Sequence, residues 1–262
     1  MREEKSLGSD LPLGKCRPIE TALSECRYQL TGDEIEEYRS LGRDAAAAIE
    51  NVARTVHPGQ TEREIARKAV DALAGCEASA IVMLVAADQR LQRFRHSVPT
   101  GQRWEKVAMI VGCARRRGLI VSLTRIVAVG ALPDDLRKRT QAAATVNANL
   151  LAATRPGYSG AQLYNVAKSS YASTGYAGEE HLHHQGACGY RTRDWVAHPG
   201  SSQTVRAKQA FAWNPSITGT KVEETCIAFE DRIETITSSL TWPKIVIAIE
   251  GEVYSFPDVL SR

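Results

Sequence analysis

The feature that most constrains the fold is a pair of Pro-Gly breaks, Pro58-Gly59 and Pro156-Gly157, which lie 98 residues apart. Each break follows a long helical stretch and precedes a shorter helix that opens with a capping box, a Ser or Thr followed three residues later by Glu or Gln. The stretches expected to be helical are 31–56, 61–75, 133–154 and 159–175. A helix pair that recurs in this way predicts two similar halves.

Apolar runs of strand length follow each helix pair, and the triplet 115–117, all arginine, separates two of them as the turn of a hairpin. The expected strands are 80–87, 106–114, 119–129, the stretch 180–190, 209–217, 222–229, 232–236 and 245–249. We therefore expect an α/β fold of the α+β type, with two halves sharing one curved antiparallel sheet, helices outside and a cleft at the junction. Residues 1–30 are expected to be a polar N-terminal extension, and residues 31–262 a single domain.

Composition narrows the function classes and the compartment. The net charge of +3 over 262 residues is too small to argue for nucleic acid as a partner. The N-terminus lacks the apolar segment of a signal peptide, and no apolar run reaches the length of a membrane span, so no membrane partner is expected. Six cysteines without CxxC spacing indicate free thiols, which favours a cytoplasmic location.

The stretch from Glu180 to Tyr190 concentrates the titratable chemistry, because three of the six histidines fall within it. If it is a strand, His181 and His183 face one side and His184 the other. Imidazole changes charge near neutral pH, so the cluster could be an acid/base centre, a zinc site or a solvated strand edge. Cys188 beside it could be a nucleophile or a small buried residue.

Four local motifs, in this order along the repeat, resemble those of the pita-bread metallopeptidases, a family that includes methionine aminopeptidase, prolidase, aminopeptidase P and the metal-free creatinase. The first resembles a His-Gly-x-Pro element, the second an Asp-x-Thr-Arg-Thr strand ending in Gly, the third a Phe-Thr-x-Glu-Pro strand, and the fourth a closing x-Glu-Asp-Thr strand with a Glu-x-Leu-Thr tail. They are His96-Ser97-Val98-Pro99, residues 122–130, Phe211-Ala212-Trp213-Asn214-Pro215, and Val222-Glu223-Glu224-Thr225 with residues 234–237. The resemblance covers about residues 31–240 and implies the pita-bread fold.

The same resemblance implies two metal ions held by five ligands, and the chain departs from that set. The positions of the two Asp ligands hold Val111 and Ser122, that of the His falls on Gly186 or Ala187, that of the first Glu holds Asn214, and only Glu223 remains. A dinuclear site needs several carboxylates to neutralise two cations. We therefore expect no metal and no other cofactor, although the histidine cluster leaves a single zinc open.

The remaining residues suit proton transfer without a metal. The resemblance to creatinase makes His96 the general acid/base, with Glu223 orienting the substrate or the imidazole and His183 or His184 as the second acid/base or an electrostatic clamp. Asn214 and Ser122 are expected to hydrogen-bond the substrate. Three arginines are candidates for binding a substrate carboxylate, and two aromatic residues for walling the pocket. The arginines are Arg93, Arg95 and Arg125, and the aromatic residues are Tyr190 and Trp213.

Two of these assignments have structural alternatives, since Arg125 could form an ion pair in the hairpin and the two aromatic side chains could belong to the core. We expect a metal-independent homodimeric enzyme that acts on a small, amino-acid-like molecule by hydrolysis of a C–N bond, or by elimination, cyclisation or isomerisation. The alternatives are a metallo-aminopeptidase or Xaa-Pro dipeptidase with an unorthodox site, and an inactive protein that binds a peptide or protein in the cleft.

Overall fold

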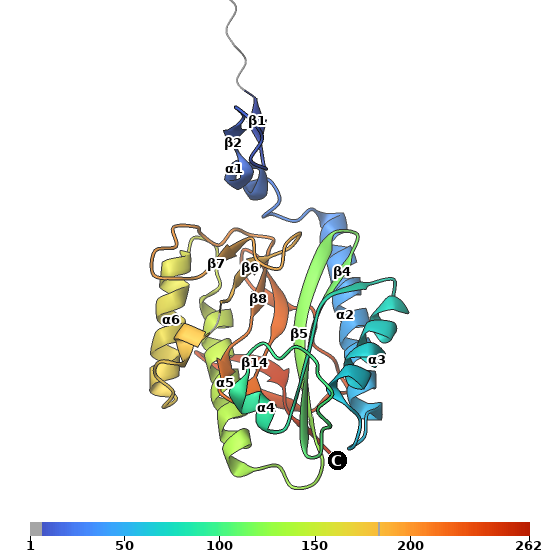
Figure 1. Cartoon of the computed structure of the whole chain (residues 1–262). Coiled ribbons are helices and arrows are strands. Elements are labelled where there is room, and N and C mark those ends of the chain that lie inside the picture. The colour runs from blue at the N-terminus through green and yellow to red at the C-terminus, as the bar shows by residue number, and fades with distance from the viewer. Residues whose placement is uncertain (1–6, 183) are drawn as a thin grey trace, which may run out of the picture.

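The structure is a computed structural model that describes residues 7–182 and 184–262. Its strands lie between two helix pairs, with α2 and α3 on one side and α5 and α6 on the other (Figure 1). The helices are α1 (Glu20–Glu25), α2 (Gly32–Thr55), α3 (Glu62–Ala74), α4 (Gln89–Arg93), α5 (Asp134–Ala153), α6 (Gly160–Ser173) and the 3₁₀ helix η1 (Glu179–Leu182). One buried cluster packs α2 and α3 on the sheet of the first half, and a second packs α5 and α6 on that of the second half.

The four long helices form where the sequence predicts them. Capping boxes at Thr31, Thr61 and Ser159 satisfy the first amides of α2, α3 and α6. The Pro-Gly breaks share one backbone conformation, because Gly59 and Gly157 both have a φ of 92°, in the left-handed region that favours glycine. An isolated β-bridge also follows each break, Thr61 to Arg103 in the first half and Ser159 to Thr204 in the second. The two halves are therefore built alike.

The strands form two principal sheets that meet in the middle of the molecule. A four-stranded sheet has the order β15-β5-β4-β3, and a five-stranded sheet the order β12-β11-β8-β6-β7. Their members are β3 (Ser79–Ala87), β4 (Val107–Arg116), β5 (Leu119–Ala128), β15 (Leu260–Ser261), β6 (Gly186–Cys188), β7 (Trp195–Val196), β8 (Gln209–Trp213), β11 (Glu224–Ala228) and β12 (Ile233–Thr235). The sheets join where β5 lies beside β11: the Thr124 amide donates to the Glu223 carbonyl at 3.2 Å, and the Ser122 amide to Thr225 Oγ1 at 2.7 Å.

The expected fold class is observed, but two expected strands are shorter than predicted. The start of the histidine stretch lies in η1 (Glu179–Leu182), and of its described residues only Gly186–Cys188 pair in a sheet. The run 209–217 is interrupted at Asn214-Pro215, because proline has no amide to donate to a ladder. The end of that run is β9 (Ser216–Ile217). The strands that were not expected include β1 (Gly8–Ser9), β2 (Arg17–Pro18), β10 (Thr220–Lys221) and β14 (Glu252–Pro257), which pairs with β13 (Lys244–Ile249).

The N-terminal segment with β1, β2 and α1 stands away from the rest of the molecule (Figure 1). It is tied to the body by ion pairs of Glu20 with Arg191 and of Glu25 with Arg206. Over the part of the chain that the structure describes, no helix is both long enough and apolar enough to span a membrane.

Candidate active site

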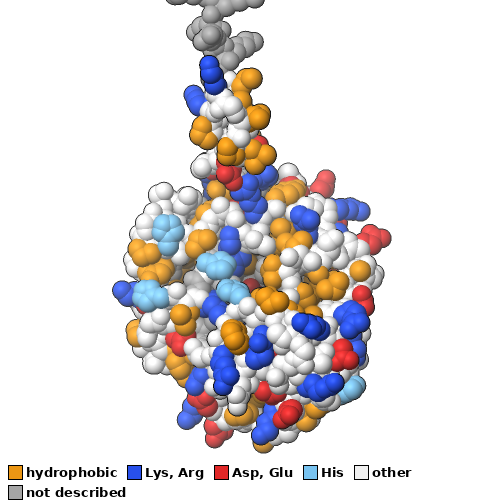
Figure 2. Space-filling model, in the orientation of Figure 1, with side chains coloured by type: hydrophobic (Ala, Val, Ile, Leu, Met, Phe, Trp, Pro, Cys, Tyr) orange, Lys and Arg blue, Asp and Glu red, His pale blue; other side chains and the backbone are white. Residues whose placement is uncertain are grey.

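A cavity of about 250 Å³ opens where the two halves meet, and it brings together five of the expected site residues. Histidine and cationic side chains gather beside a hollow on the face shown in Figure 2. The five residues come from both halves, from strands and from the loops that follow them: His96, Ser122, His184, Asn214 and Glu223. His183 lies outside the described residues.

A buried carboxylate fixes the loop that carries His96. Glu62, in the first turn of α3, is fully buried. Its Oε1 accepts from the Ala87 amide at 2.9 Å and Arg90 Nε at 2.8 Å, and its Oε2 accepts from the amide and the hydroxyl of Thr100 at 2.8 and 2.7 Å. Glu62 thus clamps both ends of the segment 87–100. Sequence reasoning missed it, although its place inside the capping box of α3 was visible.

The two histidines face each other at the mouth of the cavity. The ring centroids of His96 and His184 are 5.6 Å apart, and both side chains are exposed. Partial burial lowers the pKa of His96, and the charges of Lys221 and Arg95 lower it further. Burial also lowers the pKa of His184, with Arg193, Arg95 and Lys221 adding to the effect. Both imidazoles are therefore neutral at neutral pH and able to accept a proton.

Glu223 lies at the bottom of the cavity between a hydroxyl and an ammonium. Thr124 Oγ1 donates to its Oε2 at 2.6 Å, and Lys221 Nζ lies 4.0 Å from the same oxygen. Lys221 is buried, with its side chain 3% exposed, and burial lowers its pKa even though Glu223 opposes that shift. Sequence reasoning missed Lys221. The signal was its position two residues before Glu223, which puts both side chains on one face of an extended chain.

The other two expected residues offer polar atoms to the same space. Ser122 Oγ lies 3.2 Å from Cys113 Sγ, and Asn214 Oδ1 is buried with no hydrogen-bond partner in the described part of the chain. Burial raises the pKa of the Cys113 thiol to about 11, so it stays protonated. An unpaired buried amide oxygen is costly, and it is available to a donor on a bound molecule.

The residues at this site do not fit a pair of divalent cations. Only Glu223 of the five implied ligand positions carries a carboxylate, and within residues 7–182 and 184–262 no group of three or more His, Cys, Asp or Glu side chains could hold a metal ion. A Cβ on Gly186 would lie 2.2 Å from the Trp195 carbonyl oxygen, so β6 leaves no room for an imidazole there. The Lys221 ammonium already places a cation beside Glu223, which disfavours another.

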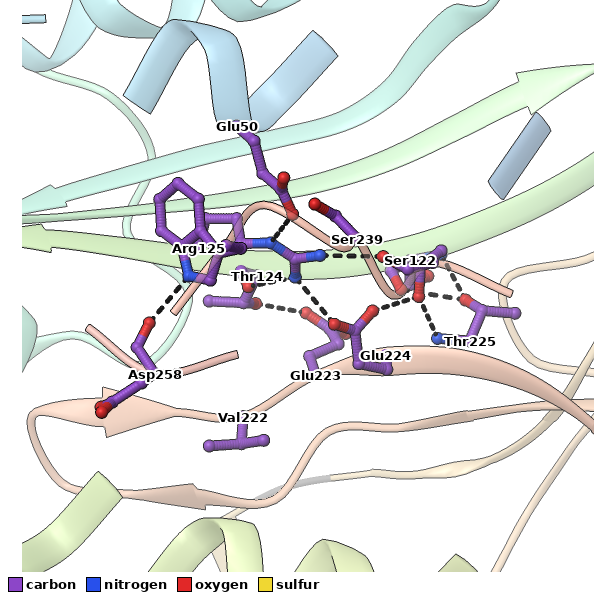
Figure 3. Close-up of polar contacts among 12 residues, drawn as sticks. Glu50, Ser122, Thr124, Arg125, Val222, Glu223, Glu224, Thr225, Ser239 and Asp258 are labelled. Carbon is purple, nitrogen blue, oxygen red and sulfur yellow. Dashed lines mark hydrogen bonds and ion pairs between the residues drawn. The ribbon is translucent and has the colours of Figure 1, made fainter. Parts of the chain in front are cut away.

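Arg125 lies outside the cavity, and the expectation that it binds substrate does not fit its surroundings. Figure 3 shows its guanidinium between Glu50 and Glu224, with Nε 2.8 Å from Glu50 Oε1 and Nη1 2.9 Å from Glu224 Oε1. Its Nη2 donates to the Thr237 carbonyl at 2.8 Å, and only 1% of the side chain is exposed. The structural alternative, a buried ion pair, describes it, because all three guanidinium nitrogens contact protein groups and the side chain is buried away from the cavity.

Two more expectations about this region are corrected, and the choice left open for Cys188 is decided. Trp213 is fully buried in the core of the second half, where it stacks on Phe211. Tyr190 donates its hydroxyl to Glu34, away from the cavity. The Cys188 thiol is buried, which raises its pKa to about 12 and leaves it a packing residue rather than a nucleophile. Cys188 in β6 and Trp213 in β8 therefore point into the protein, and Tyr190 lies beyond the end of β6.

Arg93 lines a second cavity, of about 210 Å³, together with Arg95. Lys221 lines both cavities, whereas the neighbours Arg95 and His96 line one each. The two spaces therefore adjoin, and the expected arginines lie in the one without Glu223.

Comparison with known proteins places the fold. Residues 36–236 match the model of metallopeptidase family M24. The prolidase from Pyrococcus furiosus superimposes with a TM-score of 0.76 at 19% identity, over 86% of this chain and 71% of that one. The X-Pro aminopeptidase from Thermotoga maritima gives 0.78 at 18%, over 95% and 68%, and the methionine aminopeptidase from Rickettsia prowazekii 0.68 at 13%, over 81% and 100%. A search of curated proteins found no match. Because the family model spans most of the chain, this protein belongs to metallopeptidase family M24, which the pita-bread motifs had indicated.

Proposed function

We propose that this protein hydrolyses a C–N bond in a small amino-acid-like molecule by acid/base chemistry, without a metal ion. The observation that carries the proposal is the content of the first cavity. It combines two neutral imidazoles and one carboxylate with a buried lysine, where family members are expected to hold carboxylate ligands. Perturbed titratable groups that converge on one cavity are typical of active sites.

The proposed chemistry is a proton transfer between water and the leaving nitrogen. One imidazole, His96 or His184, accepts a proton from water as the water oxygen bonds to the substrate carbon. The C–N bond then breaks, and the imidazolium returns that proton to the departing nitrogen. Lys221 and the amide of Asn214 stabilise charge on the substrate. Glu223 orients the substrate through Oε1, which accepts no hydrogen bond from the residues that the structure describes.

A second candidate is a metallo-aminopeptidase or Xaa-Pro dipeptidase with an unorthodox site. Family membership favours it, because the similar structures are named as a prolidase and as aminopeptidases. The ligand set opposes it.

One experiment separates the candidates. Protein produced in metal-rich medium is analysed for bound metals, and the release of amine from glycyl-proline and from creatine is measured before and after chelation. Turnover of either compound that survives chelation, with substoichiometric metal, supports the proposal. About two metal equivalents per chain, lost together with activity, would favour the peptidase candidate. Metal-free protein that binds these compounds without turnover would indicate an inactive binding protein.

A further inference from the structure

The second cavity contains a guanidinium that lacks the partner such a group needs. Arg95 Nε and Nη2 are buried, and neither has a hydrogen-bond partner among the residues that the structure describes. Burial lowers the pKa of Arg95 to about 10, so it remains charged at neutral pH. A buried charged donor without an acceptor costs free energy, and an arginine that stays unpaired in the free protein is typical of a binding site.

Lys221 adds a second cation at the boundary between the cavities, and its ion pair with Glu223 is long. No described residue accepts a hydrogen bond from its Nζ, and its nearest counter-charge is Glu223 Oε2 at 4.0 Å. Only 3% of the Lys221 side chain is exposed. A buried ammonium ordinarily has a carboxylate within hydrogen-bond distance, so Lys221 still has donors to offer.

Charge is unbalanced over the two cavities taken together. Their described lining includes four cationic side chains, those of Arg93, Arg95, Arg193 and Lys221, but only two carboxylates, those of Glu179 and Glu223. Glu179 is already occupied, because the Thr218 hydroxyl and amide donate to it at 3.0 and 3.2 Å. Even with both carboxylates counted, the four cations leave a net charge of +2 for a bound anion to neutralise.

We propose that the second cavity binds the carboxylate of the substrate, with Arg95 as its bidentate donor and Lys221 between that carboxylate and the scissile bond. The assignment rests on the proposed function for placing the reaction at His96, the neighbour of Arg95 in the chain. The planar guanidinium fork matches a carboxylate in geometry, and each charge-assisted hydrogen bond is stronger than a neutral one. The substrate class is thus a short amino acid derivative or dipeptide with a free carboxylate. When such a molecule is bound, Lys221 lies between its carboxylate and Glu223.

The test measures binding, so that it stands apart from turnover. Glycyl-proline is titrated against glycyl-prolinamide, which lacks only the carboxylate, by calorimetry on the intact protein and on its Arg95→Gln and Arg95→Lys variants. Arg115→Gln, an exposed arginine that lines neither cavity, is the control. We expect the protein to prefer the carboxylate about 10- to 100-fold, Arg95→Gln to remove that preference, and Arg95→Lys to restore part of it. Without ligand, Arg95→Gln should melt no lower than the parent protein, because it removes an unpaired charge.

Three results would overturn the assignment. They are equal binding of the two probes by the parent protein, an equal loss of both in Arg95→Gln, and binding of neither probe. Inorganic phosphate is titrated in parallel: if phosphate binds through Arg95 and glycyl-proline does not, the site takes a free anion and the carboxylate assignment fails. Preference for the carboxylate in a protein that turns over nothing would leave this subsite standing while removing the proposed hydrolysis.

Discussion

At the scale of single residues, the reaction is proposed to depend on His96. His96→Ala should lower turnover by roughly 10²–10⁴-fold, the usual contribution of a positioned proton-transfer group. The melting temperature should be unchanged, because the imidazole is exposed at the cavity mouth. Turnover and melting are measured on the same sample, with His181→Ala as the control, since His181 is exposed and lies near Glu180 and Tyr164 outside the cavity. A stable and fully active His96→Ala protein would remove His96 from the mechanism.

The lowered pKa values of His96 and His184 fix the direction of the pH profile. A base acts when it is neutral, so kcat/KM should rise with pH and reach half its plateau below 6.5, the ordinary value for histidine. The nearby charges of Lys221 and Arg95 contribute to this shift, so Lys221→Met should move the midpoint upward. A midpoint above 6.5 in the parent protein would contradict the environment described for both rings.

Asp194 should make stability depend on pH independently of the reaction. Both of its carboxylate oxygens are buried without a hydrogen-bond partner in the described structure, and burial raises its pKa to about 6, against the charges of Arg27 and Arg191. The folded state thus binds this proton more tightly than the unfolded state, so the free energy of unfolding falls as pH rises from about 3.8 to about 6. Asp194→Asn should raise that free energy by about 1–2 kcal/mol near pH 8. The gain should vanish near pH 4, and denaturant melts at the two pH values measure it; an equal gain at both would refute the explanation.

At the scale of elements, α3 and the loop carrying His96 act as one unit through Glu62. Glu62→Gln keeps the size of the side chain but removes the charge that Arg90 and Thr100 contact. It should cost about 3–5 kcal/mol of stability and lower turnover by releasing His96. Glu64→Gln, two residues along the same helix, is the matched control. Gln can still close the capping box, as Gln162 does at the start of α6, so this substitution should change stability little and leave turnover unchanged. Equal effects of the two substitutions would mean that Glu62 only supports the helix.

The sequence predicts those elements whose signals are local. Each capping box and each Pro-Gly break lies within a few neighbouring residues, so α2, α3, α5 and α6 were found close to their observed bounds. The stretch 180–190 was expected to be one strand, but its start lies in η1, and Gly186 packs against the Trp195 backbone. That packing depends on a contact formed only in the folded protein. The candidate cavity was found through motifs, whereas the roles of Glu62, Arg95 and Lys221 depend on partners far away in the chain.

At the scale of the whole molecule, the N-terminal segment is expected to reach a second copy. It stands away from the body and exposes Leu7, Leu11, Leu13 and Leu23, by 72%, 69%, 65% and 42%. Apolar side chains gathered on a projecting segment favour association, and closed dimers are the commonest symmetric assembly. Light scattering at micromolar concentration should therefore give about twice the chain mass of 28.6 kDa. Leu11→Ser with Leu13→Ser should shift the mass towards the monomer, and a parent protein already at 28.6 kDa would refute the expectation.

The meeting of β5 with β11 has a consequence for synthesis on the ribosome. Every residue of β5 is buried in the finished protein, yet the strand that covers its open side is made only when translation reaches residues 224–228. At a translation rate of roughly 5–20 residues per second, this apolar edge of β5 would stay exposed for several seconds after the first half is made. Nascent chains of this protein should therefore bind chaperones that cover exposed apolar strands. Slow translation between the two halves would prolong the exposure of β5.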